Sequence, residues 1–187
     1  MIIKETTLNG VLLFYPDVHR DNRGYFFESY NERDFNLYTE QNNKYEPIKF
    51  VQENVSFSEY GVLRGLHMQK SPMQQGKLVR VLKGKVFDVV VDCRRKSKTY
   101  GKHFSILLSA SNKISMYIPE GFAHGFLVRS GNGAIFQYKC TNYYSPKDEI
   151  GYMWNDKNLN IEWPATPIDI SEKDKHNVKF LIYKKYK

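Results

Sequence analysis

The chain has 187 residues, of which 41% are hydrophobic and 26% charged, and its formal net charge is +8 at pH 7. This length suits one domain with a sizeable buried core, and no apolar run approaches the roughly 20 residues that a membrane helix needs. The first residues lack the basic and apolar regions of a signal peptide, so we expect a cytoplasmic protein. The two cysteines, Cys93 and Cys140, lie in apolar, strand-like segments, which favours buried thiols over a disulfide.

The positive charge is unevenly placed, because four lysines fall within the last nine residues: Lys179, Lys184, Lys185 and Lys187. No known nucleic-acid-binding motif accompanies the charge, so we expect no nucleic acid as a partner. A basic protein does suit a small anionic ligand such as a nucleotide diphosphate, whose phosphates Arg and Lys bind well. The aromatic content of 15% supplies rings for stacking on a flat ligand.

The first part of the chain predicts strands at residues 9–15 and 25–30, with a turn signal at residues 21–24 between them. Residues 33–38 fit a short helix. Residues 50–58 then alternate with period 2. One face of this strand carries Gln52, Asn54, Ser56 and Ser58, and the other carries Val51, Val55 and Phe57.

Two neighbouring segments, residues 61–69 and 75–82, mix strand-forming apolar residues with polar ones. Period 2 predicts that Gly65, His67 and Gln69 share one face of the first strand and that Arg64, Leu66 and Met68 share the other. Charged and amide side chains between buried positions need partners, which a polar ligand would supply. These segments are therefore the first candidate for a functional site.

The rest of the chain predicts further short strands separated by turn residues, at residues 85–93, 104–108, 115–118, 126–128 and 134–141. Many short strands with little helical periodicity favour an antiparallel all-β sandwich or barrel. After Tyr144 the sequence becomes irregular. There we expect Trp154 and Trp163 to anchor a wrapping segment, and residues 171–174 to open a helical turn.

A metal site is the first chemistry to consider. Residues 119–124 have the Pro-x-Gly-x-x-His form that places a metal-ligating histidine, here His124, in cupin barrels. His67 is a second possible ligand. The accompanying His-x-His and acidic ligand are missing, since Met68 and Gln69 follow His67 and the next eleven residues contain no acid. Two ligands do not make a metal site, so we expect no metal.

Acid–base chemistry without a metal fits the residues better. His67 suits a general base because an unperturbed imidazole titrates near physiological pH. A carboxylate bonded to its second nitrogen would fix its tautomer, and Asp174 and Asp92 are both candidates. For the acid, period 2 places Tyr138 on one face of its strand with Phe136 and Cys140. The Tyr144 ring joins them if the extended conformation persists that far.

Each of these residues also has a structural interpretation. His67 fits a hydrogen-bonded structural histidine, and Tyr138 fits cross-strand packing. Asp174 fits the third position of a capping box opened by Ser171, and Lys77 fits a solvated surface lysine. The placement of Arg64, His67, Gln69 and Lys77 within fourteen residues favours a site.

Together these motifs make the sequence resemble the dTDP-4-dehydrorhamnose 3,5-epimerase family. Its members are cupin-like enzymes that invert the carbons flanking the 4-keto group of nucleotide-linked sugars. The motifs that carry the resemblance run in order through nearly the whole chain, at residues 21–28, 52–56, 61–67, 75–79, 92–94, 97–101, 118–126, 138–144, 154–156, 163–164 and 171–174.

The resemblance implies an all-β fold, a cupin-type antiparallel jelly roll with short peripheral helices and an irregular C-terminal segment. It implies one domain over residues 1–187, with residues 51–144 as the jelly-roll core and residues 145–187 as the wrapping segment. Residues 1–50 would hold strands at the interface of a homodimer, where they complete the partner's site.

The resemblance also implies roles for individual residues. His67 corresponds to the base, Asp174 to the carboxylate bonded to it, and Tyr138 to the phenol that reprotonates the opposite face. Lys77 corresponds to the residue that stabilises the enolate oxygen. The positions that match nucleotide contacts are Arg23, Phe26 and Glu28. The other substrate-binding positions are Gln52, Asn54, Arg64, His124, Tyr144, Glu149 and Lys173. No cofactor is implied.

The implied activity is inversion of C3, C5 or both in a nucleotide-linked 4-keto-6-deoxy sugar. Met68 stands where the family usually has an aromatic residue, so the same reaction on a GDP-linked 4-keto heptose, at one carbon only, is an alternative. An alternative of another class is a non-catalytic protein that binds nucleotide sugars. His67, Tyr138 and Asp174 argue against it, since binding alone does not require all three.

Overall fold

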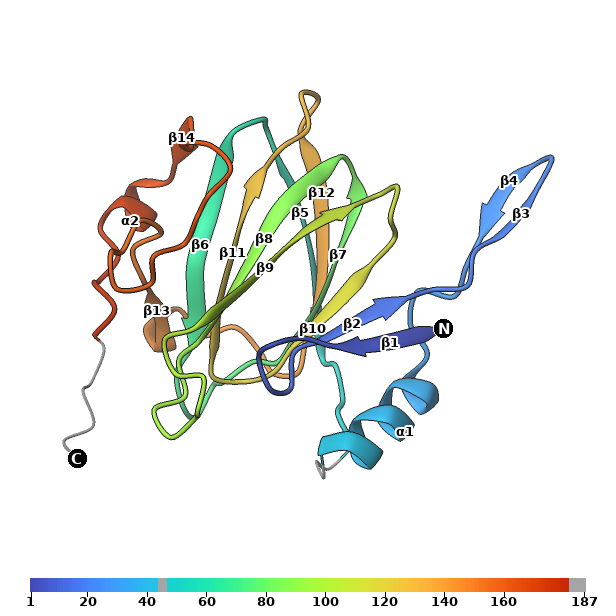
Figure 1. The fold of residues 1–187 in the computed structure, drawn as a ribbon, viewed down its shortest axis with the longest axis horizontal. Coiled ribbons are helices and arrows are strands. Elements are labelled where there is room, and N and C mark those ends of the chain that lie inside the picture. Colours follow the sequence, from blue (N-terminus) through green and yellow to red (C-terminus); the bar gives the residue numbers. More distant parts are fainter. Residues whose placement is uncertain (44–46, 182–187) are drawn as a thin grey trace.

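The computed structural model describes residues 1–43 and 47–181, which form two antiparallel sheets packed face to face (Figure 1). The first sheet has the order β1-β2-β10-β7-β12-β5. The second has the order β13-β6-β11-β8-β9, and β14 pairs with β6 in parallel. The predicted all-β class is confirmed.

The sequence did not predict the strands found at residues 2–5, 19–21, 149–151 and 169–170. The other strands in the described residues lie where they were predicted, and most differ in length. The first sheet consists of β1 (Ile2–Glu5), β2 (Leu12–Tyr15), β5 (Gln52–Ser58), β7 (Lys77–Lys83), β10 (Ser115–Ile118) and β12 (Ala134–Cys140). The second consists of β6 (Val62–Gln69), β8 (Lys85–Asp92), β9 (His103–Ser109), β11 (Phe122–Val128), β13 (Glu149–Gly151) and β14 (Asp169–Ile170). The remaining elements are a hairpin of β3 (His19–Asp21) and β4 (Gly24–Phe26), and the helices α1 (Glu32–Asn43), η1 (Pro146–Asp148) and α2 (Glu172–Lys175). None of the helices in these described ranges is long and apolar enough to cross a membrane.

Along β7 and β12 the inward residues change from apolar core residues to polar ones. In β7 the inward residues change from Val81 and Val79, which belong to the core cluster, to Lys77. In β12 they change from Phe136, which is 1% exposed, to Tyr138. Because paired residues of antiparallel strands point to the same side of a sheet, these polar positions gather at the same end of the sandwich.

The edge strand β5 has its polar face inward. Gln52 and Asn54 pair with the inward positions of β12, whereas Val55 and Phe57 are 62% and 49% exposed on the outer face. The alternation predicted for this strand is confirmed. Its amides therefore face the polar end of the sandwich rather than solvent.

Two N-terminal predictions were wrong in extent. The strand predicted at residues 25–30 ends at Phe26, and the helix predicted at residues 33–38 spans Glu32–Asn43. Phe35 of this helix packs on the outer face of the first sheet, where the centroid of its ring lies 5.3 Å from that of Phe14. Because short helices gain most of their stability from such packing, the local pattern underestimates the length of α1.

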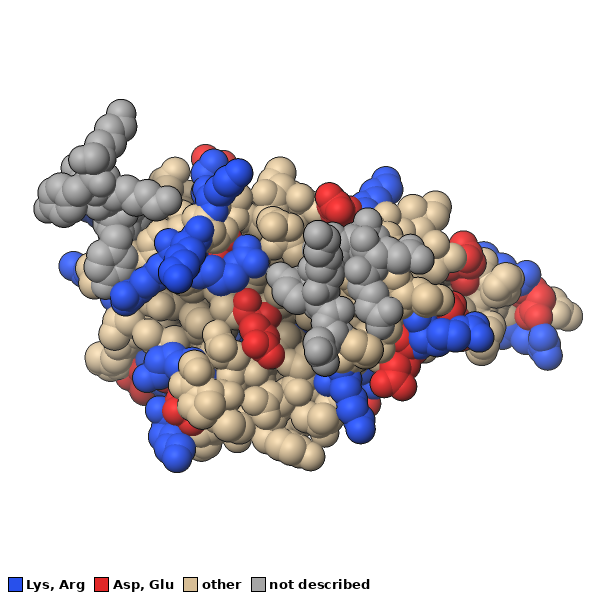
Figure 2. Space-filling view, turned by 90° about the horizontal axis from the view of Figure 1, so that it is seen from below, with Lys and Arg blue, Asp and Glu red and all other residues tan. Residues whose placement is uncertain are grey.

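Basic side chains gather at one end of the molecule, on the left of the lower face in Figure 2. The loop between β8 and β9 carries four exposed cations, Arg95, Lys96, Lys98 and Lys102. Of the C-terminal lysines, Lys179 is exposed, and Lys184, Lys185 and Lys187 lie outside the described residues. The described part of the chain therefore holds a basic cluster besides the lysines of the last nine residues.

Asp92 anchors this basic loop. Its fully buried carboxylate accepts hydrogen bonds from Arg94 Nη2 (2.8 Å), Ser97 Oγ (2.6 Å) and Thr99 Oγ1 (2.6 Å). Burial alone would raise the pKa of Asp92, but these hydrogen bonds outweigh it and hold the pKa below its usual value of 3.8. Asp92 is therefore committed to the loop and does not orient His67.

We expect Asp92→Asn to lower the free energy of unfolding by about 3 kcal/mol at neutral pH, since it leaves buried donors and Arg94 without their carboxylate. The folded-state pKa lies below the unfolded value, so this stability is present above pH 3.8 and is lost as the pH falls through the folded-state pKa. Urea unfolding of both proteins across this range measures the effect. A difference between them that does not shrink in acid would contradict the assignment.

Candidate active site

A pocket of about 280 Å³ opens at the polar end of the sandwich, between the two sheets. Residues of both sheets and of the chain after β12 line it: Gln52, Asn54, His67, Met68, Gln69, Gln75, Lys77, Tyr138, Tyr144 and Glu149. Seven of these were predicted to have catalytic or substrate-binding roles. Gln69 was named with the candidate site but was given no role, and Met68 and Gln75 were given none. The fold thus brings together residues that are up to about half the chain apart.

A β-bulge in β6 changes which of its side chains share a face, relative to the prediction. His67 lies opposite His124 of β11, and Arg64 lies opposite Phe126, with a register shift between the two pairs. The extra residue of a bulge resets the alternation, so Arg64 points inward with His67. Arg64 Nε accordingly donates to Ser58 Oγ at 2.8 Å, on the inward face of β5. The prediction that Arg64 lies on the opposite face from His67 was wrong.

Only glycine fits at position 65 of this bulge, because the neighbouring backbone leaves no space for a Cβ atom. Its φ is +127°, and a Cβ there would lie 2.5 Å from Gly125 Cα and 2.9 Å from the His124 carbonyl oxygen. Its backbone N–H donates to Asp174 Oδ2 at 3.2 Å. The bulge therefore holds His67 in place and also binds the carboxylate that serves it.

The carboxylate that orients His67 is Asp174, which is 3% exposed. Its Oδ1 is hydrogen-bonded to His67 Nε2. Asp174 also lies in the predicted capping box, since its N–H donates to Ser171 Oγ at 3.1 Å. The box leaves the carboxylate free to reach His67.

Burial alone would raise the pKa of Asp174, but hydrogen bonds from His67 and the Gly65 N–H hold it below its usual value. Asp174 is then ionised near neutral pH and accepts a hydrogen bond from the Nε2–H group of His67. This tautomer leaves the lone pair on Nδ1 of His67.

Tyr138 and Lys77 come from the first sheet, across the pocket from β6. In the register of β12 and β7, Tyr138 pairs with Val79 and Cys140 with Lys77, and Lys77 Nζ lies 6.0 Å from the centroid of the Tyr138 ring. Burial raises the pKa of Tyr138 and lowers the pKa of Lys77. The phenol therefore stays protonated in neutral solution, as an acid must.

At the mouth of the pocket, the carboxylate of Glu149 is hydrogen-bonded to two side chains. Glu149 Oε2 accepts from Lys173 Nζ at 2.6 Å and from the Tyr144 hydroxyl at 2.5 Å. Glu149 Oε1 lies 3.8 Å from His67 Nε2. Burial alone would raise the pKa of Glu149, but the hydrogen bonds from Lys173 and Tyr144 hold it below its usual value. Although β12 ends at Cys140, the Tyr144 side chain reaches the pocket as predicted.

His124 lies within the sandwich, next to a buried carboxylate. Its Nε2 is 2.8 and 3.0 Å from the two carboxylate oxygens of Asp88, and its ring stacks on Phe136 with centroids 5.8 Å apart. Burial raises the pKa of Asp88. Across the described ranges, no three His, Cys, Asp or Glu side chains come together as metal ligands would.

Comparison with known proteins identifies the family. The family model for dTDP-4-dehydrorhamnose 3,5-epimerase matches residues 5–181. The chain belongs to this family. A dTDP-4-dehydrorhamnose 3,5-epimerase of Shigella flexneri is 48% identical over 181 residues, which cover 97% of each chain. The predicted family and the epimerase class are therefore confirmed.

Solved structures of the family agree with the fold. The crystal structure of a dTDP-4-dehydrorhamnose 3,5-epimerase from Elizabethkingia anophelis has a TM-score of 0.88 and 45% identity, and the match covers 96% of each chain. A dTDP-6-deoxy-D-glucose-3,5-epimerase from Legionella pneumophila, in complex with dTDP-4-keto-L-rhamnose, has a TM-score of 0.87 and 42% identity. That match covers 95% of this chain and 92% of the other.

Three predicted substrate contacts lie far from the pocket within one chain. Arg23 and Phe26 belong to the β3–β4 hairpin, which projects away from the two sheets (Figure 1). The Arg23 side chain is 85% exposed and bonds Asp21, and Phe26 is 71% exposed. Glu28 follows the hairpin and is exposed too. The structure of a single chain does not bring these residues to His67.

Asp88 is the buried charge that sequence reasoning missed. It is fully buried in β8 and pairs with His124. Its signal was present, since one acid in the middle of the apolar run Val86–Val91 must find a partner when that strand is buried. The partner lies 36 positions away in the sequence, which local pattern reasoning does not reach.

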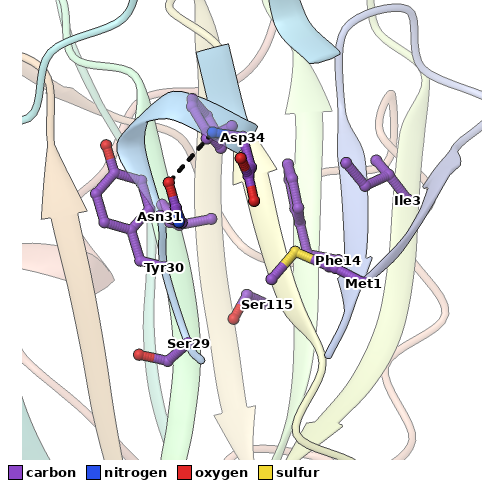
Figure 3. Close-up of a pocket in the computed structure, with 10 residues that line it drawn as sticks. Met1, Ile3, Phe14, Ser29, Tyr30, Asn31, Asp34 and Ser115 are labelled. Atoms are coloured by element: carbon purple, nitrogen blue, oxygen red, sulfur yellow. Dashed lines mark hydrogen bonds between the residues drawn. The ribbon is translucent and has the colours of Figure 1, made fainter. Parts of the chain in front are cut away.

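A second cavity, of about 180 Å³, lies between α1, the N-terminal strands and the outer face of the first sheet (Figure 3). Met1, Ile3, Phe14 and Tyr30 supply most of its apolar lining, and Asp34 contributes a carboxylate. It contains none of the predicted site residues. The predicted acid–base groups His67, Lys77 and Tyr138 line the pocket between the sheets instead.

Proposed function

We propose that this chain inverts C3, C5 or both of a dTDP-linked 4-keto-6-deoxy sugar, using His67, Asp174, Tyr138 and Lys77. The observation that carries the proposal is the arrangement of these groups around one pocket. His67 lies on the wall formed by the second sheet, and Asp174 of α2 is hydrogen-bonded to it. Tyr138 and Lys77 lie on the wall formed by the first sheet.

A hydrogen next to a ketone is acidic enough to remove only if the resulting enolate is stabilised. His67 Nδ1 takes that proton. The electron pair of the C–H bond becomes the π bond of a new C=C bond, and the π pair of the C=O bond moves to the ketone oxygen. The Lys77 ammonium group stabilises the oxygen's negative charge. The Tyr138 O–H then protonates the carbon from the opposite face, which inverts its configuration. Solvent takes the proton from His67 and returns one to Tyr138.

The remaining predicted contacts fit a nucleotide sugar. Arg64 brings a cation to the inward face, and Gln52 and Asn54 bring amides from the first sheet. Tyr144 and Lys173 bring a ring and a cation to the mouth, and His124 lies opposite His67 in the second sheet. The Legionella relative was solved with a dTDP-linked 4-keto sugar, which supports dTDP as the nucleotide and a 6-deoxy hexose as the sugar.

We propose further that the chain works as a homodimer in which the hairpin of one subunit completes the site of the other. The exposure of Arg23 and Phe26 on a projecting hairpin supports this, because Arg suits a nucleotide diphosphate and Phe suits its base. A cytoplasmic location is consistent with the two cysteines, which are free thiols.

Mixing two impaired variants tests this subunit exchange. Arg23→Ala and His67→Ala each disable a different component, so a hybrid dimer has one site in which both components are native. Random pairing makes half of the dimers hybrid, and we expect the mixture to recover about a quarter of the wild-type activity at low substrate concentration. Either variant alone is the control. A mixture no more active than the average of its two components would mean that the hairpin does not serve the partner's site.

Exchange with solvent deuterium tests the activity itself. Incubation with dTDP-, GDP- and CDP-linked 4-keto sugars in D₂O, followed by NMR, reports which carbons gain deuterium. We expect the fastest incorporation at C3, C5 or both of dTDP-4-keto-6-deoxyglucose. Incorporation only into a GDP-linked heptose would favour the alternative substrate. Tight binding without any exchange would favour a non-catalytic binding protein.

A further inference from the structure

Two glutamines of the pocket have no role in the proposed proton transfers. Gln69 of β6 is 4% exposed, and Gln75, just before β7, is 8% exposed. Both line the pocket that contains His67 and Lys77. Buried amides need hydrogen-bond partners, so the groups that each presents to the pocket indicate the ligand it suits.

The backbone fixes the orientation of both amides. Gln69 Oε1 accepts from the Ser145 backbone N–H at 3.0 Å, and a backbone N–H only donates. The NH₂ group of Gln69 is therefore the end that remains for the pocket. Gln75 Nε2 donates to the Asn142 carbonyl oxygen at 2.7 Å, and a carbonyl only accepts. Gln75 therefore keeps its oxygen for the pocket.

These open ends remain accessible to a ligand. Within the described part of the chain, every fully buried side-chain nitrogen or oxygen has a hydrogen-bond partner. Neither the Gln69 NH₂ nor the Gln75 oxygen has such a partner among the described residues. Both atoms are therefore accessible to solvent, and both side chains line the pocket. The amides of β5 differ, because Gln52 Nε2 donates to Asn54 Oδ1 at 3.1 Å and Gln52 Oε1 accepts from the Tyr144 N–H at 3.0 Å.

A donor and an acceptor that open into one pocket suit a hydroxyl group, which accepts one hydrogen bond and donates another. An anion offers no donor for the Gln75 oxygen, and a cation offers no acceptor for the Gln69 NH₂. We propose that Gln69 and Gln75 bind the sugar hydroxyl that lies beside the reacting carbons, with Gln69 donating to it and Gln75 accepting from it. This inference rests on the proposed function.

The chemistry of the sugar identifies the hydroxyl. In a 4-keto-6-deoxy hexose the nucleotide occupies O1, the ketone C4 and the ring oxygen C5, which leaves hydroxyls at C2 and C3. Because C3 is a reacting carbon, the fixed hydroxyl is at C2. Gln69 lies two residues beyond His67 on the same face, about 6.6 Å along the strand. That separation lets His67 reach a ring carbon while Gln69 reaches a substituent further along the ring.

Binding of inert sugars measures this recognition without turnover. dTDP-glucose has no ketone, and dTDP-2-deoxyglucose differs from it only in lacking the 2-hydroxyl. By calorimetry we expect wild-type protein to bind dTDP-glucose about tenfold more tightly, which is the effect of roughly one net hydrogen bond. Equal affinities in the wild type would overturn the proposal.

Gln69→Glu is the sharpest variant, because it keeps the oxygen that accepts from Ser145 and replaces only the NH₂ group. We expect the preference for the 2-hydroxyl to fall to within twofold. The repulsion between its added charge and the diphosphate is common to both ligands, so this repulsion cancels in the ratio of affinities. The matched control is Gln137→Glu on the outer face of the first sheet, where the amide donates to Glu53, and this variant should keep the wild-type preference.

Gln75→Met removes the acceptor and should also reduce the preference, which keeps the proposal testable if Gln69→Glu does not fold. A wild-type preference retained in both variants would overturn it. Failure of the proposed function is a separate result, because it shows as absent deuterium exchange with 4-keto sugars. The binding preference is measured on sugars that cannot exchange.

Discussion

His67→Ala is expected to lower the rate of deuterium incorporation next to the ketone by about 10³-fold, within the range of general acid–base contributions. The imidazole supplies the lone pair that removes the proton, and Asp174 remains bonded to the Gly65 N–H without it. NMR of the 4-keto sugar in D₂O measures the loss at C3 and C5 together.

The fold should survive this substitution, because the His67 side chain is 27% exposed and lines a pocket rather than the core. A single cooperative thermal unfolding transition checks this, with a lowered midpoint because buried Asp174 loses a hydrogen-bond partner. His103→Ala, at the start of β9, is the matched control and should exchange at the wild-type rate. Normal exchange in His67→Ala would remove His67 from the role of base.

Tyr138→Phe is expected to separate exchange from inversion. Without the phenol, the enolate still forms at His67, but no acid protonates the opposite face. His67 then returns a solvent-derived deuteron to its own face, so deuterium enters while configuration is retained. We expect inversion to fall by about 10²- to 10³-fold and exchange to fall much less.

The stereochemistry and the deuterium content of the sugar, followed by NMR in one sample, distinguish the two processes. The isosteric control is Tyr143→Phe, since the Tyr143 side chain is 61% exposed next to the site. Inversion at the wild-type rate in Tyr138→Phe would show that another group protonates the opposite face. Equal losses of exchange and inversion would place Tyr138 in the removal of the proton as well.

The sequence predicted the parts of the site that depend on strand periodicity. Tyr138 shares a face with Phe136 and Cys140 as expected, and Gln52 shares a face with Asn54, because β12 and β5 are regular and pair in register. Arg64 was misplaced because β6 is not regular. The bulge depends on the close approach of Gly65 to Gly125, a contact between strands that period 2 does not contain.

The residue pattern alone did not decide which of two carboxylates orients His67. Asp92 and Asp174 both fitted this role, and only the family resemblance assigned it to Asp174. Both have a pKa held low by hydrogen bonds. Asp92 is bonded to residues within seven positions of it, whereas Asp174 reaches across 107 positions to His67. Local motifs find the first kind of partner. The second kind exists only when α2 packs against β6.

Strand β5 shows what a reactive pocket requires of its scaffold. A sequence designed for stability alone on this backbone would place Val55 and Phe57 inward and the amides in water. The natural sequence reverses that choice and leaves both apolar side chains on an edge strand, where unpaired backbone groups already favour association. Redesign for thermostability that restores the usual hydropathy of β5 would therefore remove the amides that line the pocket.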